Sequence, residues 1–89
     1  MPVHSDAELA LEALKASGFA MNADWERAHA LAQAHEGEAV FDAIHALCHR
    51  IEGDTRNAAY WDRRAGTDFG GQGHAEEFAA VEAFARDAG

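Results

Sequence analysis

Alanine supplies 22 of the 43 apolar residues in this 89-residue chain, and this excess limits the folds that the chain can form. Alanine has the highest helix propensity of all residues and is depleted in strands. The bulky residues Val, Ile, Leu and Phe together number only 15. We therefore expect an all-α protein with a thin core, in which alanine faces allow the helices to lie close together.

So few bulky residues, together with a net charge of −9, also bring the composition near that of disordered chains. The order of the apolar residues favours a folded domain, because they recur at helical spacing. The clearest stripe lies within residues 38–52 and comprises Val40, Phe41, Ile44, Leu47, Cys48 and Ile51. No segment alternates with the period of a strand, so the pattern predicts helices alone.

Glycines divide the helical pattern into five short segments of one domain, residues 1–89. We expect helices at about residues 5–17, 23–36, 38–52, 54–65 and 74–88, with a loop over residues 66–73. Tight turns punctuated by glycine join the five helices, which places sequence neighbours antiparallel in a compact bundle.

Charge excludes several classes of function. The chain has 16 acidic and 7 basic residues, so it should repel the phosphates of DNA or RNA. Arg56, Arg63 and Arg64 form the single basic cluster, which Asp54 and Asp62 dilute. No apolar run is long enough for a membrane span, and the N-terminus does not have the pattern of a secretory signal.

Cys48 is the single cysteine, and a chain that cannot form an internal disulfide suits the reducing cytoplasm. Its neighbours His45 and His49 raise the hypothesis of a catalytic nucleophile. On a helix, however, adjacent side chains diverge by 100°, and Cys48 lies on the apolar stripe. We expect Cys48 to be a core residue and assign no catalytic residue.

Polar residues on one flank of the helix expected at 38–52 suggest a binding site: Glu38, Asp42, His45 and His49. Two histidines four residues apart can bind one transition-metal ion, with Asp42 as a third ligand. The alternative is a polar flank whose half-buried histidines hydrogen-bond to neighbours. An acid three residues before a histidine occurs here about as often as chance predicts, so we assign no metal ligand and no cofactor.

Trp25 and Trp61 are predicted to anchor the core, as large aromatic residues commonly do. The alternative places Trp61, Tyr60 and Arg64, with His29 and His45 nearby, at the rim of a groove for a peptide or small ligand.

Asp62 and the glycine-rich residues 70–73 are expected to have no role in binding. Asp62 is expected to be solvated and paired with Arg63 or Arg64. Residues 70–73 are rich in glycine, but the acids Glu76 and Glu77 that follow would repel a phosphate. This segment is therefore predicted to be a flexible linker.

The sequence Gly53-Asp54-Thr55-Arg56-Asn57-Ala58-Ala59-Tyr60-Trp61-Asp62-Arg63-Arg64-Ala65 resembles the second helix of tetratricopeptide and Sel1-like repeats. Those repeats have Gly-Asp at the turn, a small residue where Ala58 stands and alanine where Ala65 stands. The preceding helix departs from the family pattern. The resemblance implies a tetratricopeptide-like arrangement of helix pairs.

Residues 25–66 also resemble a group of small, uncharacterised bacterial and fungal helical proteins. The shared pieces are Trp25-x-x-Ala28-His29-x-x-Ala32-Gln33, Ile44-His45-Ala46-x-x-His49-Arg50-x-Glu52-Gly53-Asp54 and Asn57-Ala58-x-Tyr60-Trp61-x-Arg63-Arg64-Ala65-Gly66. The resemblance implies that the histidines and Trp61 belong to the pattern of that group. The chain departs from it at Asp62, where the group has an aromatic residue.

Two functional hypotheses follow. The preferred one is a protein-interaction or scaffold module without enzymatic activity, which binds a protein partner or associates as a homodimer, because small domains with thin cores commonly gain stability by association. The alternative is a small-ligand or metal-binding protein, or an enzyme, whose site would comprise His29, His45, His49, Trp61 and Arg64.

Overall fold

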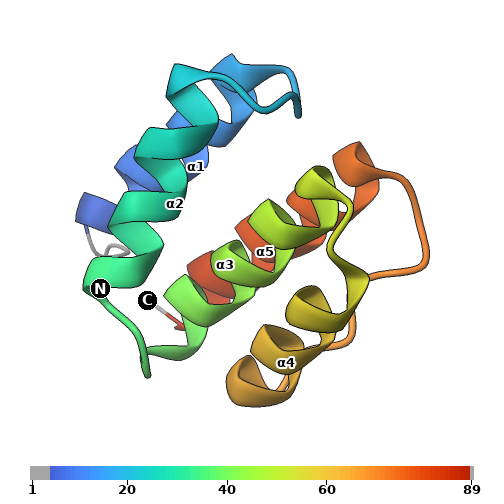
Figure 1. Cartoon of the computed structure of the whole chain (residues 1–89). Helices are drawn as coiled ribbons and strands as arrows, with labels where there is room; N and C mark the ends of the chain where they lie inside the picture. Colours follow the sequence, from blue (N-terminus) through green and yellow to red (C-terminus); the bar gives the residue numbers. More distant parts are fainter. Residues whose placement is uncertain (1–4, 89) are drawn as a thin grey trace.

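Five α-helices form the part of the chain that the computed structural model describes, residues 5–88, and these residues contain no strand (Figure 1). The helices are α1 (Ser5–Ser17), α2 (Ala23–Ala34), α3 (Ala39–Glu52), α4 (Thr55–Ala65) and α5 (His74–Ala88). The predicted all-α class and the five helices are confirmed. None of these helices combines the length and the apolar character that crossing a membrane requires.

The turn between α3 and α4 shows how the sequence sets a helix boundary. Gly53 ends α3 with a φ of 89°, a left-handed conformation that glycine adopts without steric cost. Asp54 then caps α4, because its side chain accepts a hydrogen bond of 3.1 Å from the backbone N–H of Asn57. Two residues thus reverse the chain, and α3 and α4 pack against each other.

Helix α3 occupies the centre of the fold and packs against all four other helices (Figure 1). The predicted apolar stripe is buried or half-buried along its length. The expectation of half-buried histidines on its polar flank needs correction, because every residue from 41 to 49 is buried. Asp42, His45 and His49 are therefore interior residues, since α2 and α4 cover a flank that a helix at the surface would expose to water.

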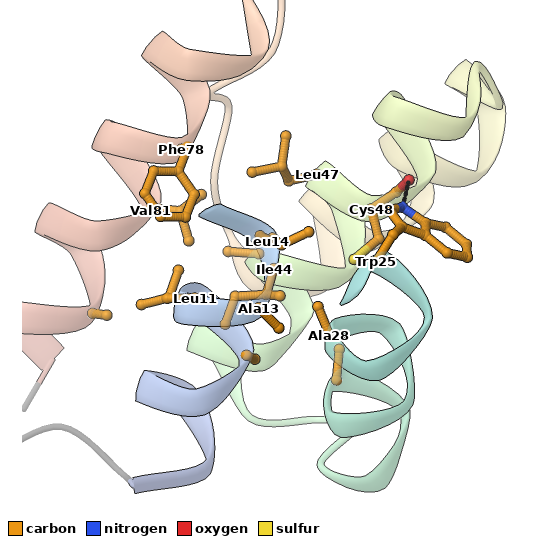
Figure 2. Close-up of a cluster of buried hydrophobic side chains, with 14 of the residues drawn as sticks. Leu11, Ala13, Leu14, Trp25, Ala28, Ile44, Leu47, Cys48, Phe78 and Val81 are labelled. Carbon is orange, nitrogen blue, oxygen red and sulfur yellow. Dashed lines mark hydrogen bonds between the residues drawn. The ribbon is translucent and has the colours of Figure 1, made fainter. Parts of the chain in front are cut away.

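Ten of the twenty buried apolar residues in the described chain are alanine. The larger side chains of the core come mainly from α1, α3 and α5 and include Leu11, Leu14, Ile44, Leu47, Phe78 and Val81 (Figure 2). Trp25 of α2 reaches α3, where its indole N–H donates a hydrogen bond of 3.0 Å to the backbone carbonyl of Cys48 (Figure 2). Alanine thus fills the close helix contacts, and a few large residues fill the remaining space.

A buried ion-pair network holds α3, α4 and α5 together. The Arg50 guanidinium donates hydrogen bonds of 2.7 and 2.8 Å to the two carboxylate oxygens of Glu77 and one of 2.7 Å to Asp62. Asp62 also accepts a hydrogen bond from the Thr67 hydroxyl. The prediction that Asp62 pairs with Arg63 or Arg64 at the surface is wrong, because this half-buried carboxylate faces Arg50 on the neighbouring helix.

The loop between α4 and α5 packs against this network, and α5 packs against α3, so the expected packing of sequence neighbours does not extend to α4 and α5. Phe69 is half-buried and lies 5.9 Å from Phe84, measured between ring centroids. Gly70 lies so close to Arg50 that a Cβ atom there would be 2.6 Å from the guanidinium carbon. A side chain at position 70 would therefore displace Arg50 from its carboxylate partners.

We expect the Gly70→Ala substitution to lower the free energy of unfolding by about 1–3 kcal/mol, the usual range for an overpacked site. Urea unfolding measures this loss. Gly73→Ala is the matched control, since its added Cβ would meet only the exposed side chain of Glu76, which can move into solvent. Equal losses in the two variants would contradict the packing role of Gly70.

Candidate functional site

Three histidines from two helices meet in one cluster, His29 on α2 and His45 and His49 on α3, which we call the histidine cluster. The Nε2 atoms of His29 and His45 lie 3.1 Å apart. One ring nitrogen from each of the three residues lies within 4.8 Å of the others. The arrangement therefore brings three imidazole donors within reach of a single bound atom.

The helix geometry explains why these three residues meet. His45 and His49 are four residues apart, so they share one side of α3, with ring centroids 4.8 Å apart. Ala28 and Ala32 on α2 are fully buried, and they flank His29 in the sequence. Because alanine permits close approach of the two helices, His29 reaches the α3 pair with ring-centroid distances of 4.8 and 5.1 Å.

Each tryptophan stacks on one histidine of the cluster. The Trp61 ring lies 3.9 Å from the His45 ring, nearly parallel to it, and the Trp25 ring lies 5.0 Å from the His29 ring. Both tryptophans are buried, as the core interpretation predicted, and Trp61 also borders the cluster. The two indoles restrict the motion of the imidazoles and exclude water from part of the cluster.

Burial holds two of the imidazoles neutral. Desolvation, together with the neighbouring His29 and His49, lowers the pKa of His45 to about 3. Desolvation and His49 also lower the pKa of His29, although the nearby carboxylates of Glu52 and Glu36 oppose the shift. Both rings therefore keep their lone pairs at neutral pH, which is the form that binds a metal ion.

His45 has only one of its two ring nitrogens satisfied. Its Nε2 shares a hydrogen bond with His29, whereas its Nδ1 is buried without a hydrogen-bond partner. Asp42, one turn earlier on α3, has a buried Oδ2 in the same condition, while its Oδ1 accepts a hydrogen bond of 3.1 Å from the Gly37 N–H. A buried polar atom without a partner costs about 1–3 kcal/mol. Buried polar atoms of this kind are few in native proteins, and a binding or catalytic role is one of their explanations.

Glu52 fixes the protonation pattern of His49. The Nδ1 atom of His49 lies 2.6 Å from the Glu52 carboxylate, and the two side chains are one turn apart at the end of α3. A carboxylate can only accept a hydrogen bond, so Nδ1 carries the proton. In the neutral ring, Nε2 is then the nitrogen with a free lone pair.

The spacing of the cluster suits a transition-metal ion. Zinc binds imidazole nitrogens at about 2.0–2.1 Å, so two ligands of a tetrahedral zinc ion lie about 3.3 Å apart. The His29 and His45 Nε2 atoms are already 3.1 Å apart. Ring rotations that bring the His49 nitrogen from within 4.8 Å to about 3.3 Å of the other two would place three nitrogens at bonding distance.

The remaining candidates lie apart from the histidine cluster. Arg64 is exposed at the end of α4, with its guanidinium 5.2 Å from the centre of the Trp61 ring, and it donates a hydrogen bond of 3.0 Å to the Tyr60 hydroxyl. Glu38 is exposed and pairs with His35, so it does not join Asp42 and the cluster.

Cys48 is fully buried in the core, as predicted, and faces the apolar cluster. Burial, with a smaller effect of Glu52, raises the pKa of its thiol to about 12. It therefore carries no thiolate at neutral pH and contributes no ligand to the histidine cluster.

Sequence reasoning missed Glu52 and the ion pair between Arg50 and Glu77. The spacing of His49 and Glu52, three residues apart on one helix, could have indicated the first contact. The second joins residues 27 positions apart, so no local pattern could indicate it.

Comparison with known proteins gives no match among protein-family models, curated proteins or solved structures. Residues 5–88 form a small all-α domain of five helices, and the geometry of the histidine cluster provides the evidence for function.

Proposed function

We propose that this protein binds one divalent transition-metal ion through His29, His45 and His49. The observation that supports this proposal most strongly is the 3.1 Å separation of the His29 and His45 Nε2 atoms, with a third imidazole nitrogen within 4.8 Å of both. Three imidazole nitrogens converge there from two helices that the core holds in place. A purely structural role would need only one hydrogen bond per ring and would not gather three.

The donor type selects the class of metal. Imidazole nitrogen suits Zn²⁺, Cu²⁺ and Ni²⁺, whereas Mg²⁺ and Ca²⁺ prefer oxygen ligands. The cluster contains three imidazoles and no carboxylate ligand. We therefore expect Zn²⁺ to bind and Mg²⁺ not to compete with it.

Three protein ligands leave the fourth tetrahedral position for water or a small molecule, as in catalytic zinc sites rather than closed structural ones. His29 is the member of the cluster that is only half-buried, so we expect solvent to reach the site from its side. This arrangement supports the hypothesis of a small-ligand or metal-binding protein.

Titration of the untagged protein with Zn²⁺, monitored by isothermal titration calorimetry, tests the proposal. The expected result is a stoichiometry of one ion per chain, with little change in Zn²⁺ affinity when Mg²⁺ is present. The His29→Gln variant should bind Zn²⁺ more than about 100-fold more weakly, because losing a ligand should exceed the 10–100-fold effect of losing a ligand's hydrogen-bond partner.

His74→Gln is the matched control, since His74 is also half-buried but lies outside the cluster, against Phe19. It should bind Zn²⁺ as the unmodified protein does. Circular dichroism of both variants checks that the helices remain. The absence of Zn²⁺ binding, or equal affinities in the two variants, would reject the proposed site.

The protein-interaction and homodimer hypothesis stays a prediction. The large apolar side chains that are exposed within residues 5–88 are Leu9, Met21 and Tyr60, on α1, on the turn after it and on α4. They do not belong to the histidine cluster, so partner binding and metal binding could be separated by experiment.

A further inference from the structure

The carboxylate of Glu52 lies beside His49, a candidate metal ligand on the same helix α3. This contact is stronger than an ordinary ion pair at the surface. The Glu52 Oε1 and His49 Nδ1 atoms are 2.6 Å apart, and the two side chains are only 30% and 10% exposed. A short hydrogen bond to a charged acceptor is about twice as strong as a neutral one. Its partial burial reduces the screening by solvent.

We infer that Glu52 is a positioning residue for metal binding, which holds His49 with its proton on Nδ1 so that Nε2 faces the bound ion. This inference rests on the proposed function. Without the carboxylate, the ring could rotate and the proton could move to Nε2, which would remove the lone pair from the metal. Carboxylates that orient a metal-binding histidine in this way also raise the basicity of the ring.

The position of Glu52 supports this role over a structural one. Asp54, which lies within 4.8 Å of the same pair, already caps α4 through the Asn57 N–H. Gly53 already ends α3. The fold therefore has other groups for the turn, and the Glu52 side chain contributes its hydrogen bond to His49.

Zinc affinity in Glu52 variants tests the inference, measured by competition with a chromophoric chelator. We expect Glu52→Ala to bind Zn²⁺ about 100-fold more weakly and Glu52→Gln about 10-fold more weakly, because the amide oxygen still accepts a hydrogen bond but has no charge. Glu8→Gln removes the same charge from an exposed position on α1 and should leave the affinity within about 2-fold at physiological ionic strength.

The tautomer of His49 provides a second measurement, by nitrogen NMR of the metal-free protein. The expected result is a proton on Nδ1 in the unmodified protein and loss of this preference in Glu52→Ala with an unchanged circular dichroism spectrum, which ties weaker Zn²⁺ binding to the His49 proton and not to a general disruption of the fold. If the unmodified protein binds Zn²⁺ and Glu52→Ala binds it equally well, the inference is wrong and the proposed function stands. If the unmodified protein binds no Zn²⁺, both are wrong.

Discussion

The Glu77→Ala variant is expected to lose about 3–5 kcal/mol of unfolding free energy, the usual effect of removing one partner from a buried ion pair. Glu77 is 1% exposed and accepts both of its hydrogen bonds from Arg50. Removing its carboxylate leaves the Arg50 charge half-buried with Asp62 alone as partner. Urea unfolding measured by circular dichroism would show the loss as a lower midpoint.

Glu76→Ala is the control for this prediction. The two glutamates are adjacent and carry the same charge, but Glu76 is exposed, so its replacement should change the unfolding free energy by less than about 0.5 kcal/mol. Glu77→Gln keeps the side-chain volume and separates the loss of charge from the loss of packing. Similar losses in Glu76→Ala and Glu77→Ala would show that the network does not join α3 to α5 as described.

Acid is expected to destabilise the metal-free protein through His45, whose folded pKa of about 3 lies below its value of 6.5 in the unfolded chain. Between these values the unfolded chain binds a proton that the folded protein does not. The unfolding free energy therefore falls as the pH drops below 6.5. His45 alone accounts for a loss of about 2 kcal/mol at pH 5 and about 3 kcal/mol at pH 4, relative to pH 7.5.

Other histidines modify this profile. The pKa of His29 is also lowered, so His29 adds to the loss in acid. The pKa of His35 is raised by its hydrogen bonds to Asp6 and Glu38. Its stabilising contribution to the unfolding free energy is therefore complete below pH 6.5 and is lost as the pH rises through its folded pKa. The test must therefore isolate His45 from these opposite effects.

Comparing the unmodified protein with His45→Gln at several pH values isolates His45. Between pH 7.5 and pH 5, the unfolding free energy of the unmodified protein should fall by about 2 kcal/mol more than that of His45→Gln. Nitrogen NMR should show His45 still neutral at pH 5, in buffer with a chelator. A constant difference, or protonation of His45 near pH 6.5, would contradict the burial of this imidazole.

The helices were predictable from sequence because their determinants are local. Alanine runs favour helix, and turns such as the one at Gly53 and Asp54 contain residues whose own conformations end one helix and begin the next. The apolar stripe on residues 38–52 also indicated which side of α3 enters the core. These features depend on residues within about one turn of each other.

The site could be predicted only in part. Helical spacing placed His45 and His49 together, but the approach of His29 depends on how α2 crosses α3. A helical wheel also could not show that α2 and α4 cover the polar flank of α3, so His45 and His49 were expected to be half-buried, whereas they are buried. Asp62 was misplaced for the same reason, since its partner Arg50 belongs to another helix.

X-ray absorption at the zinc edge of the Zn²⁺-loaded, untagged protein tests the central claim most directly, because it reports the donor atoms themselves. We expect three imidazole nitrogens at about 2.0–2.1 Å, with one further light atom from water or a small molecule. His29→Gln should reduce the imidazole count, whereas His74→Gln should not. A shell of oxygen atoms without imidazole scattering would contradict the account of the histidine cluster as a metal site.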